Sequence, residues 1–273
     1  MRAAEQHFDS VRKLVRERTG ITLAGAQDYL IESRLSALAK RCAVPDLQLL
    51  LHRAFSGDRD LQEQVVASLA NHETLFFRDR KPFDELRNAV LPALQAKPLG
   101  TGPLRIWSAG CSTGQEIYSV AMILDGMGLL ARRVPPELYA TDFSASAVQR
   151  AAAGAFSQFE VQRGLPSALL VKYFRQDGLN WIIDGRLRKA VRFERRNLHD
   201  SSAGLGPFDI VLCRNVLMYF DAEGRKRALA GLTAAIKPGG YLLTGLADLI
   251  AEEPPGFEPW PGVCAAWRKA ESR

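Results

Sequence analysis

Polar side chains that could bind a small ligand follow several short apolar runs of the kind that form β-strands. The first group is a glycine turn, Gly110 to Gly114 in RIWSAGCSTGQE, with Glu116 just beyond it. Three later apolar runs end at further candidate positions: Asp142, Asn197-Leu198 and Arg214-Asn215. In doubly wound α/β sheets, ligands bind outside the carboxyl ends of the strands. We therefore expect these four strand ends to meet at one binding site.

The chemistry of the glycine turn argues against a phosphate ligand. It lacks the Lys-Ser/Thr pair that follows the glycines of a P-loop, and the carboxylates of Glu116 and Asp142 would repel a pyrophosphate. They favour a ligand with ribose hydroxyls and positive charge, and S-adenosylmethionine has both. A nicotinamide dinucleotide is the alternative, with Glu116 merely at the favourable N-terminus of a helix. However, Asp142 comes later than the ~20-residue spacing of a dinucleotide fingerprint.

Two different patterns divide the chain around a short linker. Residues 1–95 carry apolar residues at helical spacing, such as Leu35 and Leu38, and predict an all-helical N-terminal domain. The stretch 96–103, rich in Gly and Pro, is typical of a linker. In residues 104–273, β-type apolar runs alternate with helical stretches. That alternation predicts an α/β domain with a parallel sheet covered by helices on both faces.

The segment 168–196 interrupts this alternation. It contains two Asp-Gly pairs, at 177–178 and 184–185, which are typical of hairpin turns. We expect two or three consecutive antiparallel strands here, forming a small β insertion in the α/β domain.

Composition limits the class of protein without identifying it. Of the 273 residues, 47% are hydrophobic and 24% charged, and no apolar run approaches the ~20 residues of a membrane span. The start of the sequence lacks the apolar core of a secretion signal. The cysteines and histidines are scattered, so we expect neither disulfides nor a metal site. We also expect a cytoplasmic protein. The cysteines are Cys42, Cys111, Cys213 and Cys264. The net charge of +6 leaves nucleic acid, an anionic membrane and an acidic protein open as partners.

Six segments, in the same order along the chain, resemble the successive motifs of the CheR chemotaxis methyltransferases. They are NHETLFFRD (71–79), RIWSAGCSTGQEIYSVAM (105–122), ATDFSASAVQRA (140–151), RRNL (195–198), FDIVLCRNVLMYF (208–220) and IKPGGYLLTG (236–245). The resemblance covers nearly the whole chain. It implies a helical N-terminal domain for receptor recognition, followed by a Rossmann-like methyltransferase domain with a small antiparallel β insertion.

The resemblance also implies an activity: methylation of glutamate side chains on the cytoplasmic helices of chemoreceptors, with S-adenosylmethionine as donor and S-adenosylhomocysteine as product. Asp142 would hold the ribose, while Asn197 and Leu198 would flank the adenine. Arg78 and Tyr219 would lie near the transferred methyl as the catalytic residues. The full set of implied donor contacts is Asn71, Thr74, Arg78, Gly110, Glu116, Asp142, Asn197, Leu198, Arg214 and Asn215. The structural alternatives are a salt bridge from Arg78 to Asp79 or Glu73, and a core position for Tyr219.

Basic residues near the N-terminus are candidates for contact with an acidic receptor. Between residues 11 and 41 there are seven Lys/Arg against three acids, and Arg34 and Arg41 share one helical face. In the family, the helix in this region follows the receptor's methylation helix, so Arg34, Lys40 and Arg41 are the expected substrate contacts. An ordinary solvated helix face would explain them equally well. We expect a monomer that binds receptor helices. We expect it neither to bind nucleic acid nor to insert into a membrane.

Two departures from the family pattern keep a second function open. The usual G-E-E-P-Y reads Gly114-Gln115-Glu116-Ile117-Tyr118, and the usual G-H-S-E-S-L reads GLADLI at 245–250. The alternative is a donor-binding homologue with weak or no activity that acts as a sensor or scaffold. Methylation of nucleic acid is less favoured, because the Asp/Asn-Pro-Pro-aromatic motif is absent and RNVLMYF occupies its place.

Overall fold

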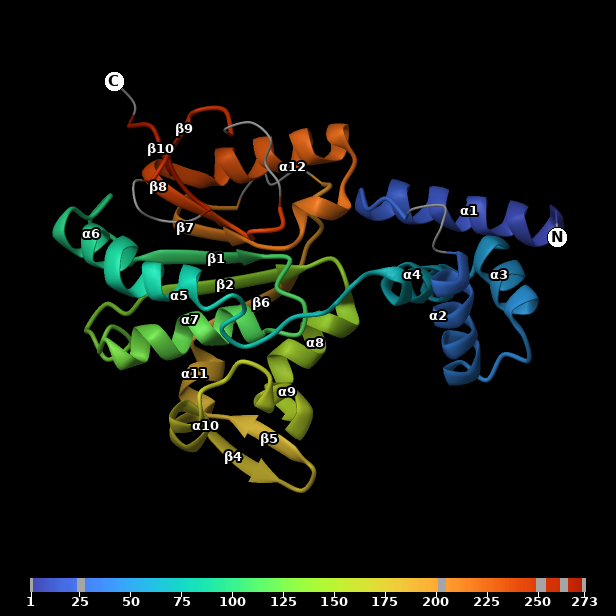
Figure 1. Cartoon of the computed structure of the whole chain (residues 1–273), viewed down its shortest axis with the longest axis horizontal. Coiled ribbons are helices and arrows are strands. Elements are labelled where there is room, and N and C mark those ends of the chain that lie inside the picture. The colour runs from blue at the N-terminus through green and yellow to red at the C-terminus, as the bar shows by residue number, and fades with distance from the viewer. Residues whose placement is uncertain (1, 24–27, 201–204, 249–253, 261–264, 272–273) are drawn as a thin grey trace. The chain divides into compact units, whose positions relative to one another are not determined.

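The computed structural model describes residues 2–23, 28–200, 205–248, 254–260 and 265–271. The chain divides into two compact units (Figure 1). The helical unit comprises residues 1–71 with 219–226, and the α/β unit comprises residues 72–218 with 227–273. Within the described ranges, no helix has both the length and the apolar character needed to cross a bilayer. Cys264 and residues 249–250 of the GLADLI segment lie outside these ranges.

The helical unit is built from amphipathic helices with short connections. They are α1 (Arg2–Thr19), α2 (Asp28–Arg41), α3 (Leu47–Phe55) and α4 (Arg59–Leu69). Asp46 and Asp58 start α3 and α4, since their carboxylates accept hydrogen bonds from the backbone N–H three residues later. Apolar side chains at helical spacing, among them Leu35, Leu50 and Val65, are fully buried. The short segment 219–226 joins this unit through a backbone bridge between Ile21 and Phe220.

The chain from His72 to Ala96 belongs to the α/β unit. It forms α5 (Lys81–Glu85), a π-helical stretch (Leu86–Val90) and α6 (Leu91–Ala96). Phe83, Leu86 and Leu91 are buried in the same core as the strand residue Ile106. The division between the units thus falls at residue 71, earlier than the expected linker at 96–103.

Within the described residues, seven strands form the central sheet, in the order β6-β2-β1-β7-β8-β10-β9. The strands are β1 (Arg105–Ala109), β2 (Glu137–Asp142), β6 (Val191–Arg195), β7 (Phe208–Cys213), β8 (Ile236–Thr244), β9 (Phe257–Pro259) and β10 (Ala266–Lys269). The first five are parallel, and β10 runs antiparallel to both its neighbours. The chain leaves β1 towards β2 and β6, then returns to the other side of β1 as β7. The topological switch point therefore lies between β1 and β7, where such folds bind ligands.

Helices cover both faces of this sheet, as the alternating pattern predicts. Helices α7 (Gln115–Gly126) and α8 (Ala145–Ala153) lie on one face, and residues 227–235 of α12 (Ala222–Ala235) lie on the other (Figure 1). Ala228 and Leu232 of α12 are buried, and so is nearly all of α7. The α/β fold class is confirmed.

The small antiparallel sheet differs in part from the expectation for residues 168–196. Its strands are β3 (Ala155–Ser157), β5 (Asn180–Ile183) and β4 (Phe174–Asp177), in the order β3-β5-β4. The hairpin at 177–178 is present between β4 and β5. The second expected hairpin, at 184–185, is wrong: Asp184 instead caps α11 (Gly185–Lys189), and residues 191–195 pair in parallel with β2. Asp-Gly can begin a helix as well as a hairpin, because the aspartate side chain can accept a hydrogen bond from a backbone N–H in the first turn of the helix.

Two further helices flank the small sheet, and the expected strand pattern does not include them. They are α9 (Gln158–Gln162), which precedes the segment 168–196, and α10 (Ser167–Tyr173), which overlaps its start. The insertion packs against the segment that begins the α/β unit, because the Phe76 ring meets Phe156 and Phe174 edge-on at 5.0 and 5.6 Å between ring centroids. Gly164, between α9 and α10, has a positive φ of 88°, and a Cβ there would collide with the Phe76 carbonyl oxygen.

We expect Gly164→Ala to destabilise the protein by roughly 2 kcal/mol more than Gly178→Ala. Both glycines have a positive φ, so alanine strains the backbone at each, at about 1–2 kcal/mol. Only Gly164 also faces backbone, whereas Gly178 faces open space, and overpacking adds about 1–3 kcal/mol. Thermal unfolding of the two variants measures the difference. Equal melting temperatures would show that the close approach to Phe76 is not present in solution.

Candidate functional site

The glycine turn after β1 is fixed by the end of β2. The N–H groups of Gly110 and Cys111 both donate to the Thr141 carbonyl, at 2.8 and 2.9 Å. Gly110 has a φ of 78°, and a Cβ there would lie 2.7 Å from a methyl of Val216. Glycine is therefore required at 110 by both the backbone conformation and the loop that follows β7. Gly114, at the N-terminus of α7, lies against Ala151 of α8.

Asp142 ends β2 with a buried carboxylate that backbone N–H groups hold in place. Its Oδ2 accepts from Ser112 N at 2.9 Å and its Oδ1 from Ser144 N at 3.0 Å. Burial raises the pKa of Asp142, while the charge of His72 and these N–H groups act in the opposite direction. A carboxylate can accept about four hydrogen bonds in all, so Asp142 keeps capacity for ligand hydroxyls beside its backbone donors. The arrangement suits a pair of neighbouring hydroxyls such as those of a ribose.

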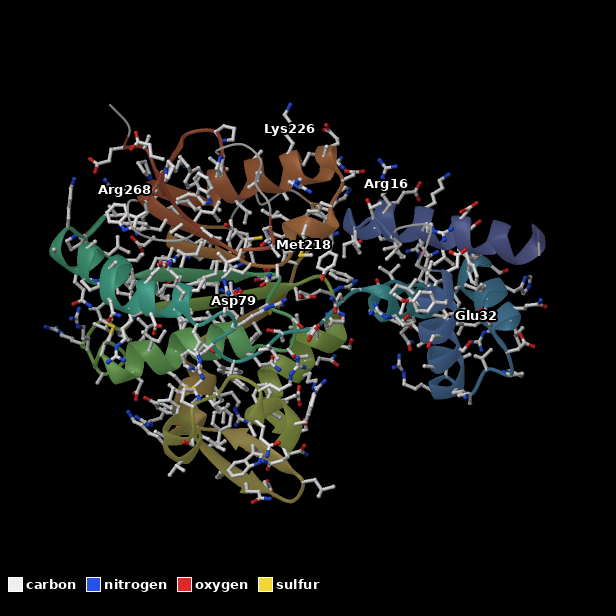
Figure 2. The ribbon with its side chains drawn as sticks, viewed as in Figure 1. Arg16, Glu32, Asp79, Met218, Lys226 and Arg268 are labelled. Carbon is white, nitrogen blue, oxygen red and sulfur yellow. The ribbon has the colours of Figure 1, made fainter. Side chains whose placement is uncertain are left out.

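Glu116 and Arg214 form a buried ion pair across the switch point. Glu116 accepts from Ser108 Oγ at 2.8 Å and from Arg214 Nη1 at 3.2 Å. Burial raises the pKa of Glu116, and the adjacent Arg214 charge lowers it. Arg214 Nη2 donates to Asp79 Oδ2 at 2.9 Å; Asp79 is labelled in Figure 2. The Arg214 side chain, 1% exposed, thus lies between two carboxylates.

The loop that carries Arg78 is held from several sides. Arg214 Nη2 also donates to the Arg78 carbonyl at 2.7 Å, and Phe77 N donates to Ser119 Oγ of α7 at 3.0 Å. Phe77, Asp79 and Arg80 all have positive φ, from 48° to 67°. Three such non-glycine residues in four are costly, and they persist only where surrounding contacts enforce them. The direction in which Arg78 leaves the backbone is therefore fixed by its surroundings.

The expected structural alternatives for Arg78 can be compared with its contacts. Arg78 Nη1 donates to the Glu73 carbonyl at 3.1 Å, and the Arg78 charge also lowers the pKa of the Glu73 carboxyl group. The Glu73 carboxylate pairs with Arg163 at 2.9 Å, and the Asp79 carboxylate pairs with Arg214.

The loop after β7 contains Asn215 in a left-handed conformation with a φ of 57°. Its Oδ1 is buried and has no hydrogen-bond partner within the described part of the chain. A buried acceptor without a donor is costly, so this oxygen is a natural contact for a ligand N–H or O–H. The Asn215 backbone N–H donates to Asp248, which the sequence analysis did not single out.

Two other candidate donor contacts in the α/β unit follow a strand at the same edge of the sheet. Asn197 and Leu198 follow β6, the neighbour of β2, and both are half-buried. The Asn197 side-chain oxygen accepts from His199 N at 3.0 Å. Thr74, also half-buried, lies in the loop between His72 and Arg78.

Asn71 and Tyr219 belong to the helical unit. Asn71 Nδ2 donates to the Tyr219 hydroxyl oxygen at 2.7 Å. Because the tyrosine accepts in this bond, its own O–H is left to donate elsewhere. The Tyr219 side chain is half-buried rather than a core aromatic.

Of the candidate receptor contacts, one has a structural role in the helical unit. Arg34 Nη1 donates to the carbonyls of Leu69 and Ala70, at 2.8 and 3.1 Å, and so closes the C-terminal end of α4. Lys40 and Arg41 lie exposed in the last turn of α2.

The departure at Gln115 has a local explanation. Its buried amide accepts from Thr113 Oγ1 at 2.8 Å and donates to Glu160 Oε1 at 3.4 Å. A carboxylate at position 115 would face the Glu160 carboxylate, which also caps α9. The amide therefore fits because its partner here is an acid.

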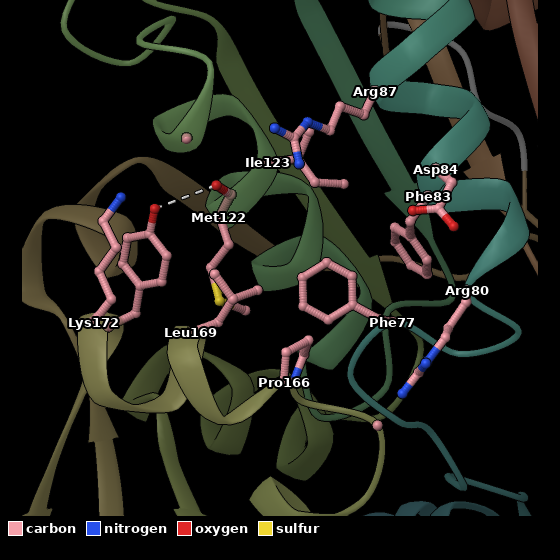
Figure 3. A pocket seen from close by; sticks show the side chains of 13 residues that line it. Phe77, Arg80, Phe83, Asp84, Arg87, Met122, Ile123, Pro166, Leu169 and Lys172 are labelled. Atoms are coloured by element: carbon pink, nitrogen blue, oxygen red, sulfur yellow. Dashed lines mark hydrogen bonds between the residues drawn. The ribbon is translucent and has the colours of Figure 1, made fainter.

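A separate cavity of about 520 Å³ lies beside the Arg78 loop (Figure 3). Its apolar lining includes Phe77, Phe83 and Leu169, and Figure 3 shows Arg80 and Lys172 at its border. The Arg214 guanidinium lies 5.0 Å from the Phe83 ring centroid. None of the candidate site residues lines this cavity.

A doubly wound sheet, a glycine turn without a phosphate-binding lysine and a buried carboxylate at the end of β2 agree with the class of S-adenosylmethionine-dependent methyltransferases. The family described as CheR methyltransferase, SAM binding domain, matches residues 72–263. A second family, described as CheR methyltransferase, all-alpha domain, matches residues 6–70. The chain belongs to the CheR methyltransferase family.

Curated relatives are similar to nearly the whole chain. Chemotaxis protein methyltransferase 1 of Pseudomonas aeruginosa is 38% identical over 264 residues, which cover 94% of this chain and 95% of that protein. Chemotaxis protein methyltransferase Cher2 of Pseudomonas putida is 36% identical over 92% of this chain and 93% of its own length. The chemotaxis protein methyltransferase of Borreliella burgdorferi is 33% identical over 87% of this chain and 86% of its own length. The predicted family, cofactor and enzyme class are confirmed.

Proposed function

We propose that this protein transfers the methyl group of S-adenosylmethionine to glutamate side chains on the cytoplasmic helices of chemoreceptors. The products are glutamyl methyl esters and S-adenosylhomocysteine. The carboxylate of Asp142, held by the N–H groups of Ser112 and Ser144, is the observation that carries the donor site. A reaction on cytoplasmic receptor helices would take place in the cytoplasm.

The residues at the strand ends fit the donor better than a dinucleotide. Asp142 would bind the ribose hydroxyls, and the buried Asn215 Oδ1 would accept from an N–H or O–H of the donor. The carboxyl groups of Glu116, Asp79 and Asp142 lie in this part of the site, beside the Arg214 guanidinium. Carboxylate charges attract a sulfonium and repel a pyrophosphate. These charges favour the methyl donor over a nicotinamide cofactor.

The chemistry needs alignment more than acid–base catalysis. When bound, the donor supplies an electrophilic methyl group on a positively charged sulfur. A glutamate with a reference pKa of ~4.3 is already ionised at neutral pH, so no strong general base is required. Opposite charges cancel as the methyl is transferred, and exclusion of water therefore favours the reaction. Orientation alone can contribute up to ~7–11 kcal/mol.

Arg78 and Tyr219 are the groups that we assign to orienting the acceptor carboxylate. Arg78 projects from a loop fixed by Arg214 and Ser119. Tyr219 accepts from Asn71 and keeps its O–H for donation. Each of these donors would bind an oxygen of a carboxylate and leave other lone pairs of that carboxylate for the methyl.

The exposed Lys40 and Arg41 at the end of α2 are the proposed contacts to the acidic receptor helix. Arg34 supports this surface indirectly, by fixing α2 against the end of α4. A monomer is sufficient for this mode of binding.

Tyr219→Phe should lower kcat about tenfold or more, and Arg78→Ala should have an effect at least as large. Each removes a hydrogen bond to a charged group, worth about 1.5–3 kcal/mol. Transfer of radiolabelled methyl to a receptor cytoplasmic fragment, followed by base-labile release of methanol, measures the rate. Tyr29→Phe, which removes an exposed hydroxyl from the same unit, is the matched control and should change nothing.

The outcomes separate the two candidate functions. Full turnover by both Arg78→Ala and Tyr219→Phe, with unchanged donor affinity, would remove these residues from the active site. Binding of S-adenosylhomocysteine by the wild-type protein without methyl transfer to any receptor fragment would favour the sensor or scaffold function. The departure at 245–250 supports that alternative, whereas the contacts of Gln115 do not.

A further inference from the structure

Asp248 is a buried carboxylate whose partners are backbone N–H groups. Only 4% of the residue is exposed. Its Oδ2 accepts from Asn215 N and from Gly245 N at 2.9 Å, and its Oδ1 accepts from Met218 N at 3.1 Å. Burial raises the pKa of Asp248, and the hydrogen bonds from Gly245, Met218, Asn215 and Val216 act in the opposite direction. The carboxylate thus binds one segment of main chain from residue 215 to residue 218.

The backbone N–H groups of this segment need a hydrogen-bond acceptor, because the segment does not belong to a β-strand or an α-helix that would supply one. It connects the buried end of β7 to the short 3₁₀ turn Leu217–Tyr219, and Asn215 is left-handed. Successive N–H groups in such a turn form a concave site for an anion. Asp248 fills that site from the neighbouring loop after β8.

Two glycines confirm how closely the segment is enclosed. A Cβ on Gly245 would lie 2.7 Å from the Asn215 backbone nitrogen. On the opposite side, a Cβ on Gly110 would lie 2.7 Å from the Val216 side chain. The loop after β7 is therefore packed between the turns that follow β1 and β8, with Asp248 as its hydrogen-bonding anchor.

The same loop presents two parts of the candidate donor site. Arg214 begins it and pairs with Glu116 and Asp79. Asn215 contributes the buried Oδ1, which has no hydrogen-bond partner among the residues that the structure describes. A change in the loop backbone would move that oxygen, so the effect of Asp248 on the ligand requires no direct contact between them.

We propose that Asp248 is a positioning residue for donor binding, which holds residues 214–218 in the conformation that directs Asn215 towards the donor. This inference rests on the placement of the donor at the strand ends, which is part of the proposed function. It concerns binding of the donor alone and is independent of the receptor substrate.

The matched control is Asp209, a buried aspartate at the other end of β7. It is 3% exposed and binds Arg105 N and Lys237, both at 2.8 Å. Asp248→Asn and Asp209→Asn each exchange one oxygen of a buried carboxylate for an amide donor. Both variants should lose stability, and only the first alters the donor site.

We expect Asp248→Asn to weaken the binding of S-adenosylhomocysteine, measured by titration calorimetry, by about tenfold or more. Asp209→Asn should leave that affinity within about twofold of wild type, at a comparable loss of thermal stability. An equal effect of both variants, or an unchanged affinity in Asp248→Asn, would overturn the proposal.

A second measurement uses the wild-type protein and does not depend on the variant folding. The amide protons of Asn215, Val216 and Met218 should exchange with solvent as slowly as those of buried strands, because Asp248 accepts from them. Exchange as fast as in the exposed hairpin at 177–178 would overturn the role of Asp248. Failure of wild type to bind S-adenosylhomocysteine would instead contradict the proposed donor site and leave the exchange result to be judged separately.

Discussion

Asp142→Ala should lower the affinity for S-adenosylhomocysteine by roughly a hundredfold, the largest expected effect of any single change at the donor site. Its carboxylate would accept both ribose hydroxyls, and a hydrogen bond to a charged group contributes about 1.5–3 kcal/mol. A loss of about 3 kcal/mol over the two bonds corresponds to a factor of ~100 or more in the dissociation constant. Titration calorimetry with S-adenosylhomocysteine measures it directly.

The size of this effect follows from preorganisation. The N–H groups of Ser112 and Ser144 already hold the Asp142 carboxylate, so binding the ribose would order no further side chain. Asp177→Ala removes an exposed aspartate from the hairpin of the small sheet and should leave the affinity unchanged. An affinity loss below about threefold in Asp142→Ala would place the ribose elsewhere.

The strand ends that form the candidate site could be predicted from the sequence because each follows a clear apolar run. The switch point needs only the order of the strands, and Gly110, Asp142 and Arg214 all lie at carboxyl ends around it. The small sheet could be predicted only in part. Asp177-Gly178 makes a hairpin and Asp184-Gly185 begins a helix, and the two pairs carry the same local signal.

Partners distant in sequence account for what could not be predicted. Gln115 departs from the family pattern, and its partner Glu160 lies 45 residues away. Arg214 has the position of a ligand contact, yet its side chain binds Glu116 and Asp79, 98 and 135 residues away. Asp248 binds backbone N–H groups, which every residue but proline possesses. Its partners therefore cannot be recognised from residue types in the sequence.

Arg214→Met should destabilise the protein by about 3–5 kcal/mol, because it leaves buried Glu116 without its cation. The melting temperature of a protein of this size should fall by roughly 10 °C. Arg175→Met, at an exposed pair with Asp177, is the control and should cost less than about 1 kcal/mol.

The double variant Arg214→Met/Glu116→Gln tests whether the ion pair is the cause. Removing the carboxylate charge together with its partner should recover part of the lost stability, since no buried charge is then left unpaired. Additive losses from the two single variants would show that Arg214 stabilises the fold mainly through Asp79, the Arg78 carbonyl and the Phe83 ring.

The pH dependence of Arg214→Met gives an independent check with a definite sign. Burial raises the pKa of Glu116, and Arg214 opposes that rise, so removing the arginine must raise the pKa further. A carboxyl group whose folded-state pKa is raised favours folding at low pH, and that contribution is lost as the pH rises through the folded pKa. The stability deficit of Arg214→Met relative to wild type should therefore be smaller at pH 5 than at pH 8. Denaturant unfolding at both pH values measures it, and a deficit independent of pH would mean that Glu116 does not become an unpaired charge when the arginine is removed.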